Sequence, residues 1–340
     1  MKHAINQMLA TFALAVGVAV PAFADEVVNV YSSRHYDTDD ALYDAFEEAT
    51  GITVNIIEGD ADALLTRIAQ EGELSPADVF IAVDAGRLQL AVDKDVLAST
   101  ESDVLDERIP DNLRHPDGLW FGLSKRVRVI FLSPDVPNDF VTTYAELADP
   151  KVDGGLLIRS SGNVYNQSLV ASIIANDGVD AAQAWAEGIV ENLARTPQGG
   201  DTDQLRALAA GEGEIAVANH YYFARLLGSD DASNRAVAEK LTLVFPNQDG
   251  RGAHVNISGA GILKNAPNRE NAIKLLEFLT TVEAQELYAV ANYEYPVVSG
   301  VELSDILKSF GEFEEDELNA SELGENNRAA VKVMDRAGWR

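Results

Sequence analysis

The chain alternates short apolar runs with longer amphipathic ones from residue 26 onward, and this alternation constrains the fold more than any other feature. Short apolar runs are typical of strands, whereas apolar residues three or four positions apart are typical of helices. Repeated strand–helix–strand units predict a mostly parallel sheet covered by helices. In the first part of the chain we expect strands at 27–31, 52–57 and 79–83, and helices at 42–49 and 63–70.

A second set of the same kind follows and does not repeat the first set in sequence. Its strands are expected at 127–132, 156–158 and 215–218 and its helices at 164–174 and 270–280, with a glycine-rich stretch at 245–263. Two such sets predict two α/β lobes, because a typical domain holds about 150 residues. Ligands of open α/β sheets bind beyond the carboxyl ends of the strands, so the segments that directly follow strands are candidates for a site.

The first 24 residues have the pattern of a secretory signal. Lys2 precedes an apolar run at 8–20, and this run is followed by the small-x-small sequence Ala22-Phe23-Ala24. The run is shorter than the roughly 20 residues that a membrane-spanning helix needs. We therefore expect an exported, periplasmic protein that is cleaved after Ala24 and keeps 316 of its 340 residues.

Composition limits the chemistry that the chain can perform. The absence of cysteine excludes disulfides, zinc–thiolate sites, iron–sulfur clusters and thiol catalysis, so any metal must be held by oxygen or imidazole nitrogen. The mature chain carries 25 basic and 55 acidic residues, which argues against nucleic acid or an anionic membrane as a partner and leaves cations as ligands.

Tyrosines recur in three segments that directly follow expected strands, at 31–36, 159–168 and 219–225. Each segment taken alone also has a structural explanation, with one ring in the core or one side chain in a loop. Together they offer phenols from both expected lobes. The candidate metal ligands are His35, Tyr36, Tyr165, Tyr221 and Tyr222.

A phenolate is a hard, anionic oxygen donor, and a cluster of phenolates favours ferric iron over zinc, copper or calcium. A phenol has an ordinary pKa of about 10, so the metal must displace its proton, which a trivalent ion does more readily than a divalent one. Binding should therefore weaken as the pH falls. The same site can also hold Fe(II) if one phenol stays protonated.

Four phenolates around one trivalent ion leave a single negative charge, and burying that charge calls for a nearby cation. Arg34 and Arg128 are the candidates. The alternative for both is an ordinary surface or interlobe salt bridge, which explains Arg128 equally well.

These segments together resemble the bacterial periplasmic ferric-ion-binding proteins, the transferrin-like branch of the solute-binding proteins that serve ABC importers. The resemblance rests on YSSRHY, RSSGNVYNQSL and NHYYFARL in that order, with KRVRVIF as a crossing strand, and covers essentially the whole mature chain. It implies a type II periplasmic-binding-protein fold, with two lobes of mixed β-sheet flanked by helices and hinged by crossing strands. It places an N-lobe at 25–127 plus 253–300 and a C-lobe at 128–252 plus 301–340, with the ligand cleft between them.

Carried over to this chain, the resemblance implies that Tyr36, Tyr165, Tyr221 and Tyr222 bind iron and leaves His35 as either a fifth ligand or a bystander. The sequence departs from the His-plus-Glu pattern that uses phosphate or carbonate as a partner anion, which argues against an obligatory synergistic anion; water or a small anion can complete the shell. The implied mechanism is lobe closure on the metal, followed by recognition of the closed form by an inner-membrane ABC permease. It also implies a monomer that binds an iron ion or a small ferric chelate without catalysis.

Two other interpretations use the same segments. A small-oxyanion binder would receive its ligand at the helix starts near Ser33 and Ser160, but has no need of four phenols. An exported hydrolase would use Ser161 or Ser33 as nucleophile and His35 or His220 as base. The G-x-S-x-G motif of such enzymes is absent from the sequence.

Overall fold

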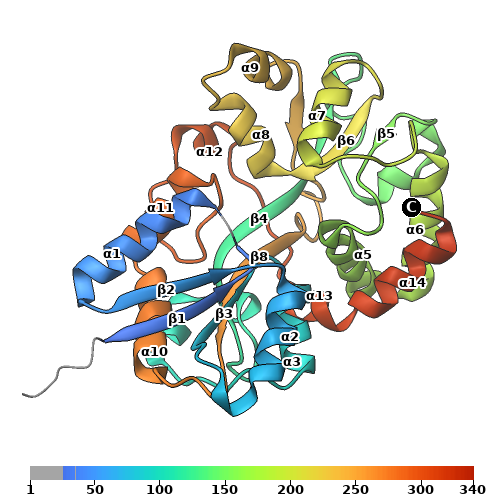
Figure 1. The fold of residues 1–340 in the computed structure, drawn as a ribbon. Coiled ribbons are helices and arrows are strands. Elements are labelled where there is room, and N and C mark those ends of the chain that lie inside the picture. Colours follow the sequence, from blue (N-terminus) through green and yellow to red (C-terminus); the bar gives the residue numbers. More distant parts are fainter. Residues whose placement is uncertain (1–25, 35) are drawn as a thin grey trace, which may run out of the picture.

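The computed structural model describes residues 26–34 and 36–340, which form two α/β lobes joined by long strands (Figure 1). The predicted signal peptide at 1–24 and the candidate ligand His35 lie outside the described residues. The strands are β1 (Val27–Ser32), β2 (Thr53–Glu58), β3 (Val79–Ala82), β4 (Phe121–Leu132), β5 (Leu156–Leu157), β6 (Ile215–Asn219), β7 (Thr242–Val244) and β8 (Val255–Ile262). The α-helices are α1 (Asp40–Thr50), α2 (Ala61–Glu71), α3 (Ala85–Asp93), α4 (Asp103–Arg108), α5 (Val164–Asp177), α6 (Val179–Glu191), α7 (Asp201–Ala209), α8 (His220–Leu227), α9 (Ala232–Ala238), α10 (Arg269–Leu279), α11 (Val282–Ala291), α12 (Asp305–Ser309), α13 (Ser321–Glu325) and α14 (Asn327–Ala337).

The first lobe is built on a mixed sheet in the order β2-β1-β3-β8-β4. Strand β1 pairs in parallel with β2 and β3, as the strand–helix repeats predict, whereas β8 runs antiparallel to β3 and β4. The glycine-rich stretch at 245–263 thus contains strand β8, which its glycine content did not indicate. A Cβ at Gly261 would lie 2.6 Å from the carbonyl oxygen of Leu119, and one at Gly259 would lie 2.8 Å from that of Phe121. These glycines let the neighbouring backbone approach closely.

The second lobe is built on β4, β6, β5 and β7, and it shares β4 with the first lobe. The part of β4 up to Val127 pairs with β8, and the part from Arg128 onward pairs with β6, with β7 joining at Ile130. The predicted crossing strand at 127–132 is therefore the second half of a longer strand. In Figure 1, β4 runs from the lower lobe into the upper one, and β8 lies beside its first half.

Side chains alternate along the second half of β4 and feed two separate cores. Ile130 and Leu132 pack in one apolar cluster with Trp185, while Val129 and Phe131 pack in another on the opposite face of the sheet. A third, larger cluster fills the first lobe. Each lobe therefore has its own core, and the two cores of the second lobe lie on either side of its sheet.

The C-terminal segment touches both lobes. Ala320 and Leu323 belong to the apolar cluster of the first lobe, and Val333 and Met334 belong to a cluster of the second. Helix α13 contacts both α3 and α5. The lobe boundaries expected from the sequence stay a prediction. Within residues 26–34 and 36–340, no helix combines the length and the apolarity needed to cross a membrane.

The connection between β7 and β8 contains a glycine that a larger residue should not replace. Gly252 has φ +87°, and a Cβ there would lie 2.5 Å from the carbonyl carbon of Glu315. We predict that Gly252→Ala lowers the free energy of unfolding by about 2–4 kcal/mol, because the left-handed backbone and the clash both oppose the methyl group. Gly250→Ala is the control, since its Cβ would meet no atom closer than 3.6 Å. Urea unfolding measures both, and equal stabilities of the two variants would contradict the prediction.

Candidate metal centre

Each candidate tyrosine that the structure describes lies in the segment between a strand and the first turn of the next α-helix. Tyr221 and Tyr222 stand in the first turn of α8, which begins directly after β6, and Tyr165 is the second residue of α5. These three come from the second lobe. Tyr36 comes from the first lobe, in the short connection between β1 and α1.

The structure brings these four phenols, here called the phenol cluster, to one place. The Tyr221 hydroxyl donates a hydrogen bond to the Tyr165 oxygen at 3.2 Å, and the Tyr221 and Tyr222 rings lie with centroids 4.3 Å apart. Tyr36 approaches from the opposite lobe: the Arg225 guanidinium lies 4.9 Å from the Tyr36 ring centroid and 5.1 Å from that of Tyr221. The strand-to-helix turn at the start of α8 places the rings of the adjacent residues Tyr221 and Tyr222 side by side.

Burial raises the pKa values of Tyr36, Tyr165 and Tyr221. Desolvation raises the pKa of Tyr221 well above its ordinary value, and the neighbouring phenols Tyr165, Tyr36 and Tyr222 raise it further because a second phenolate would repel the first. Burial raises the pKa of Tyr165 to about 12, again with a contribution from a neighbouring phenol. Burial also raises the pKa of Tyr36. A strong cation is needed to ionise the cluster.

Arg34, one of the two predicted cations, lies beside the phenol cluster and is paired with two carboxylates. Its guanidinium contacts Asp39 at 2.6 Å and Glu294 at 2.7 Å, and all three groups are buried. The same guanidinium lies 4.7 Å from the Tyr36 ring centroid and 4.9 Å from that of Tyr288. These contacts of Arg34 hold the segment between β1 and α1, which carries Tyr36, in place.

Arg128, the other predicted cation, forms a buried salt bridge with Asp201 at 2.8 Å and hydrogen bonds to Asn166 and Asn219. Its guanidinium lies 6.0 Å from the Tyr165 ring centroid. This arrangement is the ordinary salt bridge that the sequence left open as the alternative.

Arg126, which sequence reasoning did not single out, lies nearer to Tyr165 than Arg128 does. Its guanidinium is 5.1 Å from the Tyr165 ring centroid, its ion pair with Asp84 is long at 3.3 Å, and its Nε has no hydrogen-bond partner among the described residues. The sequence could have indicated Arg126, because residues two apart in a strand lie on the same face and Arg126 precedes the candidate Arg128 by two. Arg225, which lies between the Tyr36 and Tyr221 rings, was missed as well.

His220, the candidate base of the hydrolase interpretation, has both ring nitrogens engaged. Its Nδ1 accepts a hydrogen bond from the Val127 amide at 3.1 Å, and its Nε2 donates to the Tyr293 carbonyl at 2.7 Å. Burial lowers the pKa of His220 to about 4. This histidine is a neutral core residue that fixes the start of α8.

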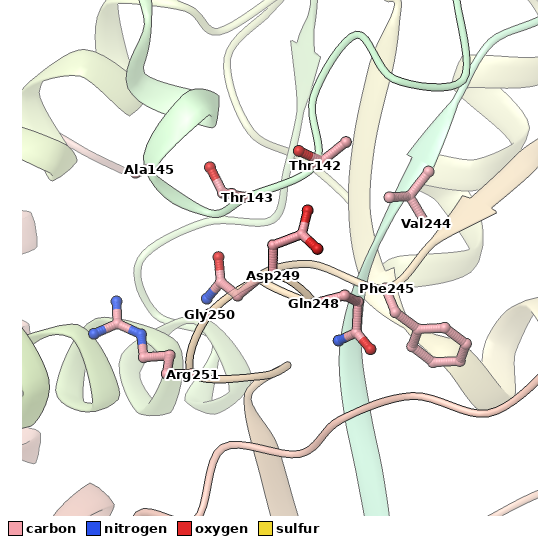
Figure 2. Close-up of a pocket in the computed structure, with 10 residues that line it drawn as sticks. Thr142, Thr143, Ala145, Val244, Phe245, Gln248, Asp249, Gly250 and Arg251 are labelled. Atoms are coloured by element: carbon pink, nitrogen blue, oxygen red, sulfur yellow. The ribbon is translucent and has the colours of Figure 1, made fainter.

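Two cavities show where a ligand has room. One of about 600 Å³ opens at the carboxyl ends of the first-lobe strands and reaches Val164, the residue before Tyr165. The other, of about 590 Å³, lies outside the phenol cluster, with Thr142 and Thr143 on one side and Gln248 and Asp249 on the other (Figure 2). In the part of the chain that the structure describes, no group of three or more histidine, aspartate or glutamate side chains is placed to hold a metal.

The fold is that of a two-lobed binding protein of the type II periplasmic class, as in the solved structures described below. The model of the bacterial extracellular solute-binding proteins matches residues 41–315, and the chain belongs to that family. Iron uptake protein A1 of Synechocystis is 50% identical over 314 residues, covering 92% of this chain and 87% of that protein.

Solved structures agree with this assignment. A Trichodesmium protein solved in complex with iron and citrate ligands has a TM-score of 0.90 and 53% identity, covering 92% of this chain and 100% of that one. The ferric binding protein from Campylobacter jejuni has a TM-score of 0.86 and 42% identity, with coverage of 92% and 100%. The resemblance to ferric-ion-binding proteins that the sequence indicated is confirmed.

The buried histidines should make stability depend on pH. Burial holds the pKa of His220 at about 4 and that of His254 at about 3, whereas an exposed histidine has a pKa of about 6.5. Below pH 6.5 the unfolded chain therefore binds protons that the folded chain does not. We predict that the free energy of unfolding falls by about 1.4 kcal/mol per pH unit per histidine between about pH 6 and pH 4.

Urea unfolding from about pH 7 to pH 4 measures this slope, with His220→Gln as the comparison. The variant lacks one titrating histidine, so its free energy of unfolding should fall less steeply with pH, by about 1.4 kcal/mol per pH unit. Identical slopes would show that His220 is already protonated in the folded protein.

Proposed function

We propose that this chain is the periplasmic iron-binding component of an ABC-type uptake system and that it binds Fe(III) through Tyr36, Tyr165, Tyr221 and Tyr222. The observation that carries the proposal is the convergence of these phenols from both lobes, with the Tyr221 and Tyr165 oxygens 3.2 Å apart. Relatives named as iron uptake and ferric-binding proteins, at up to 50% identity among curated sequences, support the choice of metal.

The electrostatics of the cleft suit a trivalent ion. Because burial raises the pKa values of Tyr165 and Tyr221, these two phenols keep their protons until the metal displaces them, and only then become anionic. With four phenolates, the ion leaves one negative charge. Arg126 and Arg225 are placed to balance it: Arg126 faces Tyr165 with a long ion pair to Asp84 at 3.3 Å, and the Arg225 guanidinium lies 4.9 Å from the Tyr36 ring centroid and 5.1 Å from that of Tyr221.

Lobe closure follows from the placement of the ligands. Three phenols belong to the second lobe and bind the ion first, and Tyr36 completes the shell when the first lobe rotates about the crossing strands β4 and β8. His35 stays a prediction, as either a fifth ligand or a bystander. The closed form is the form that an inner-membrane permease recognises, and the monomer binds and releases iron without catalysing a reaction.

The cavity beside the cluster supports delivery of iron as a small chelate. It measures about 600 Å³ and reaches from Ser33 on the first lobe to Val164 on the second. A chelator occupying this space can stay with the ion until the lobes close, without an obligatory synergistic anion. The relative from Trichodesmium was solved with both iron and citrate.

Removing single hydroxyls tests the metal site. We predict that mature protein titrated with ferric citrate develops a one-to-one tyrosinate charge-transfer band, and that Tyr165→Phe or Tyr222→Phe weakens iron binding by at least about tenfold, the loss that even outer-shell changes produce. Tyr295→Phe is the control, because Tyr295 is a buried phenol whose oxygen has no partner among the described residues. A protein that shows no band but binds phosphate would instead be an oxyanion-binding protein.

Proton displacement should make iron affinity depend steeply on pH. Because the pKa values of Tyr36, Tyr165 and Tyr221 are raised, each of these phenols loses a proton to bind the metal. We predict that affinity falls as the pH falls, by about tenfold per pH unit for each proton displaced. Competition with a chelator of known proton affinity between about pH 8 and pH 5 measures the slope. A pH-independent affinity would rule out phenolate ligands.

A further inference from the structure

The carboxylate of Asp84 lies at the junction of the two lobes. Asp84 follows β3 and caps α3, where its Oδ1 accepts a hydrogen bond from the Gly86 amide at 2.8 Å. The residue is 0% exposed. Because water does not reach it, the carboxylate depends on protein donors for its stability.

Two of those donors come from the two crossing strands. Asn256 of β8 donates to Oδ2 at 2.9 Å, and Arg126 of β4 contacts the same oxygen at 3.3 Å. Arg126 and Asn256 are partners in the β4–β8 register, and one residue later that pairing ends and β4 begins to pair with β6. Asp84 therefore binds both strands at the point where the chain passes from one lobe to the other.

The remaining donor comes from the second lobe. The hydroxyl of Ser168, on α5, lies 3.0 Å from Oδ1 and 3.2 Å from Oδ2, and Ser168 is 0% exposed. Ser168 lies three residues after Tyr165, on the same side of α5 and one turn along. Arg126, which also contacts Asp84, lies against the Tyr165 ring. One carboxylate thus connects the first lobe, the hinge and the helix that carries a candidate iron ligand.

We propose that Asp84 is a positioning residue for iron binding: its hydrogen bond with Ser168 holds α5, and with it Tyr165, against the hinge in the closed arrangement. The proposal rests on the proposed function. Separation of the lobes along this contact breaks an interlobe hydrogen bond in a place from which solvent is excluded, and this opposes opening. The bond therefore slows the release of iron without touching the metal.

Ser168→Ala removes this bond and leaves all four phenols and the other donors to Asp84 in place. Ser172→Ala is the matched control, because Ser172 lies one turn further along α5, is 4% exposed, and donates to the Leu169 carbonyl of its own helix at 2.8 Å. Both variants lose one buried hydroxyl from the same helix. Only Ser168→Ala loses an interlobe contact.

We expect Ser168→Ala to release iron to a competing chelator about 3- to 10-fold faster than wild type, the range that one net hydrogen bond supplies. The tyrosinate band should keep its position, since the ligands are unchanged. Ser172→Ala should release iron at the wild-type rate even where its thermal stability falls as far as that of Ser168→Ala. Equal release rates in the two variants, or rates that only follow stability, would overturn the proposal.

Solution scattering of the iron-free proteins separates this proposal from the proposed function. We expect the radius of gyration of iron-free Ser168→Ala to exceed that of Ser172→Ala, because the closed arrangement has lost a contact. A wild-type protein without a tyrosinate band would refute the iron site while leaving this comparison intact. Equal radii in the two variants would refute the hinge role even if wild type binds iron.

Discussion

Strand β4 makes backbone hydrogen bonds in both lobes, with β8 along its first half and with β6 and β7 along its second. A strand cannot shift its register in one sheet without shifting it in the other, so the two lobes have a fixed relation at this point and can move only about it. The alternation of side chains along the same strand directs Arg126 and Arg128 to one face, close to Tyr165. The same strand therefore joins the two lobes and carries the two arginines that lie near Tyr165.

The buried arginines near the cleft differ in how their charges are matched. Arg34 and Arg128 form short ion pairs with carboxylates, which makes them structural anchors for the segments that carry Tyr36 and Tyr165. Arg126 shares a single carboxylate oxygen with another donor, and its contact is longer. A buried cation that is weakly paired in the metal-free state is well suited to a site whose negative charge arises only when the metal binds.

In the proposed function, ligation and lobe closure depend on different groups. The phenols would supply the metal's donors, and the raised pKa values of Tyr165 and Tyr221 would tie binding to proton release. Asp84 contributes no donor to the cluster, yet it contacts both crossing strands and α5. Affinity and release rate can thus be adjusted by different residues, which is useful for a protein that must bind iron tightly and still deliver it.

The sequence by itself determined the α/β elements, the phenols at strand ends and the class of metal, because periodicity, turn chemistry and donor hardness are local properties. It placed Tyr165 near a helix start and Tyr221 and Tyr222 after a strand, where the structure has them. Only the tertiary structure decided that the glycine-rich stretch holds β8, that α13 contacts both lobes, and that Arg126 faces the phenols more closely than Arg128 does. The contact of Asp84 with Ser168 joins residues 84 positions apart. Such pairings depend on how separate elements pack, and no local pattern in the chain encodes them.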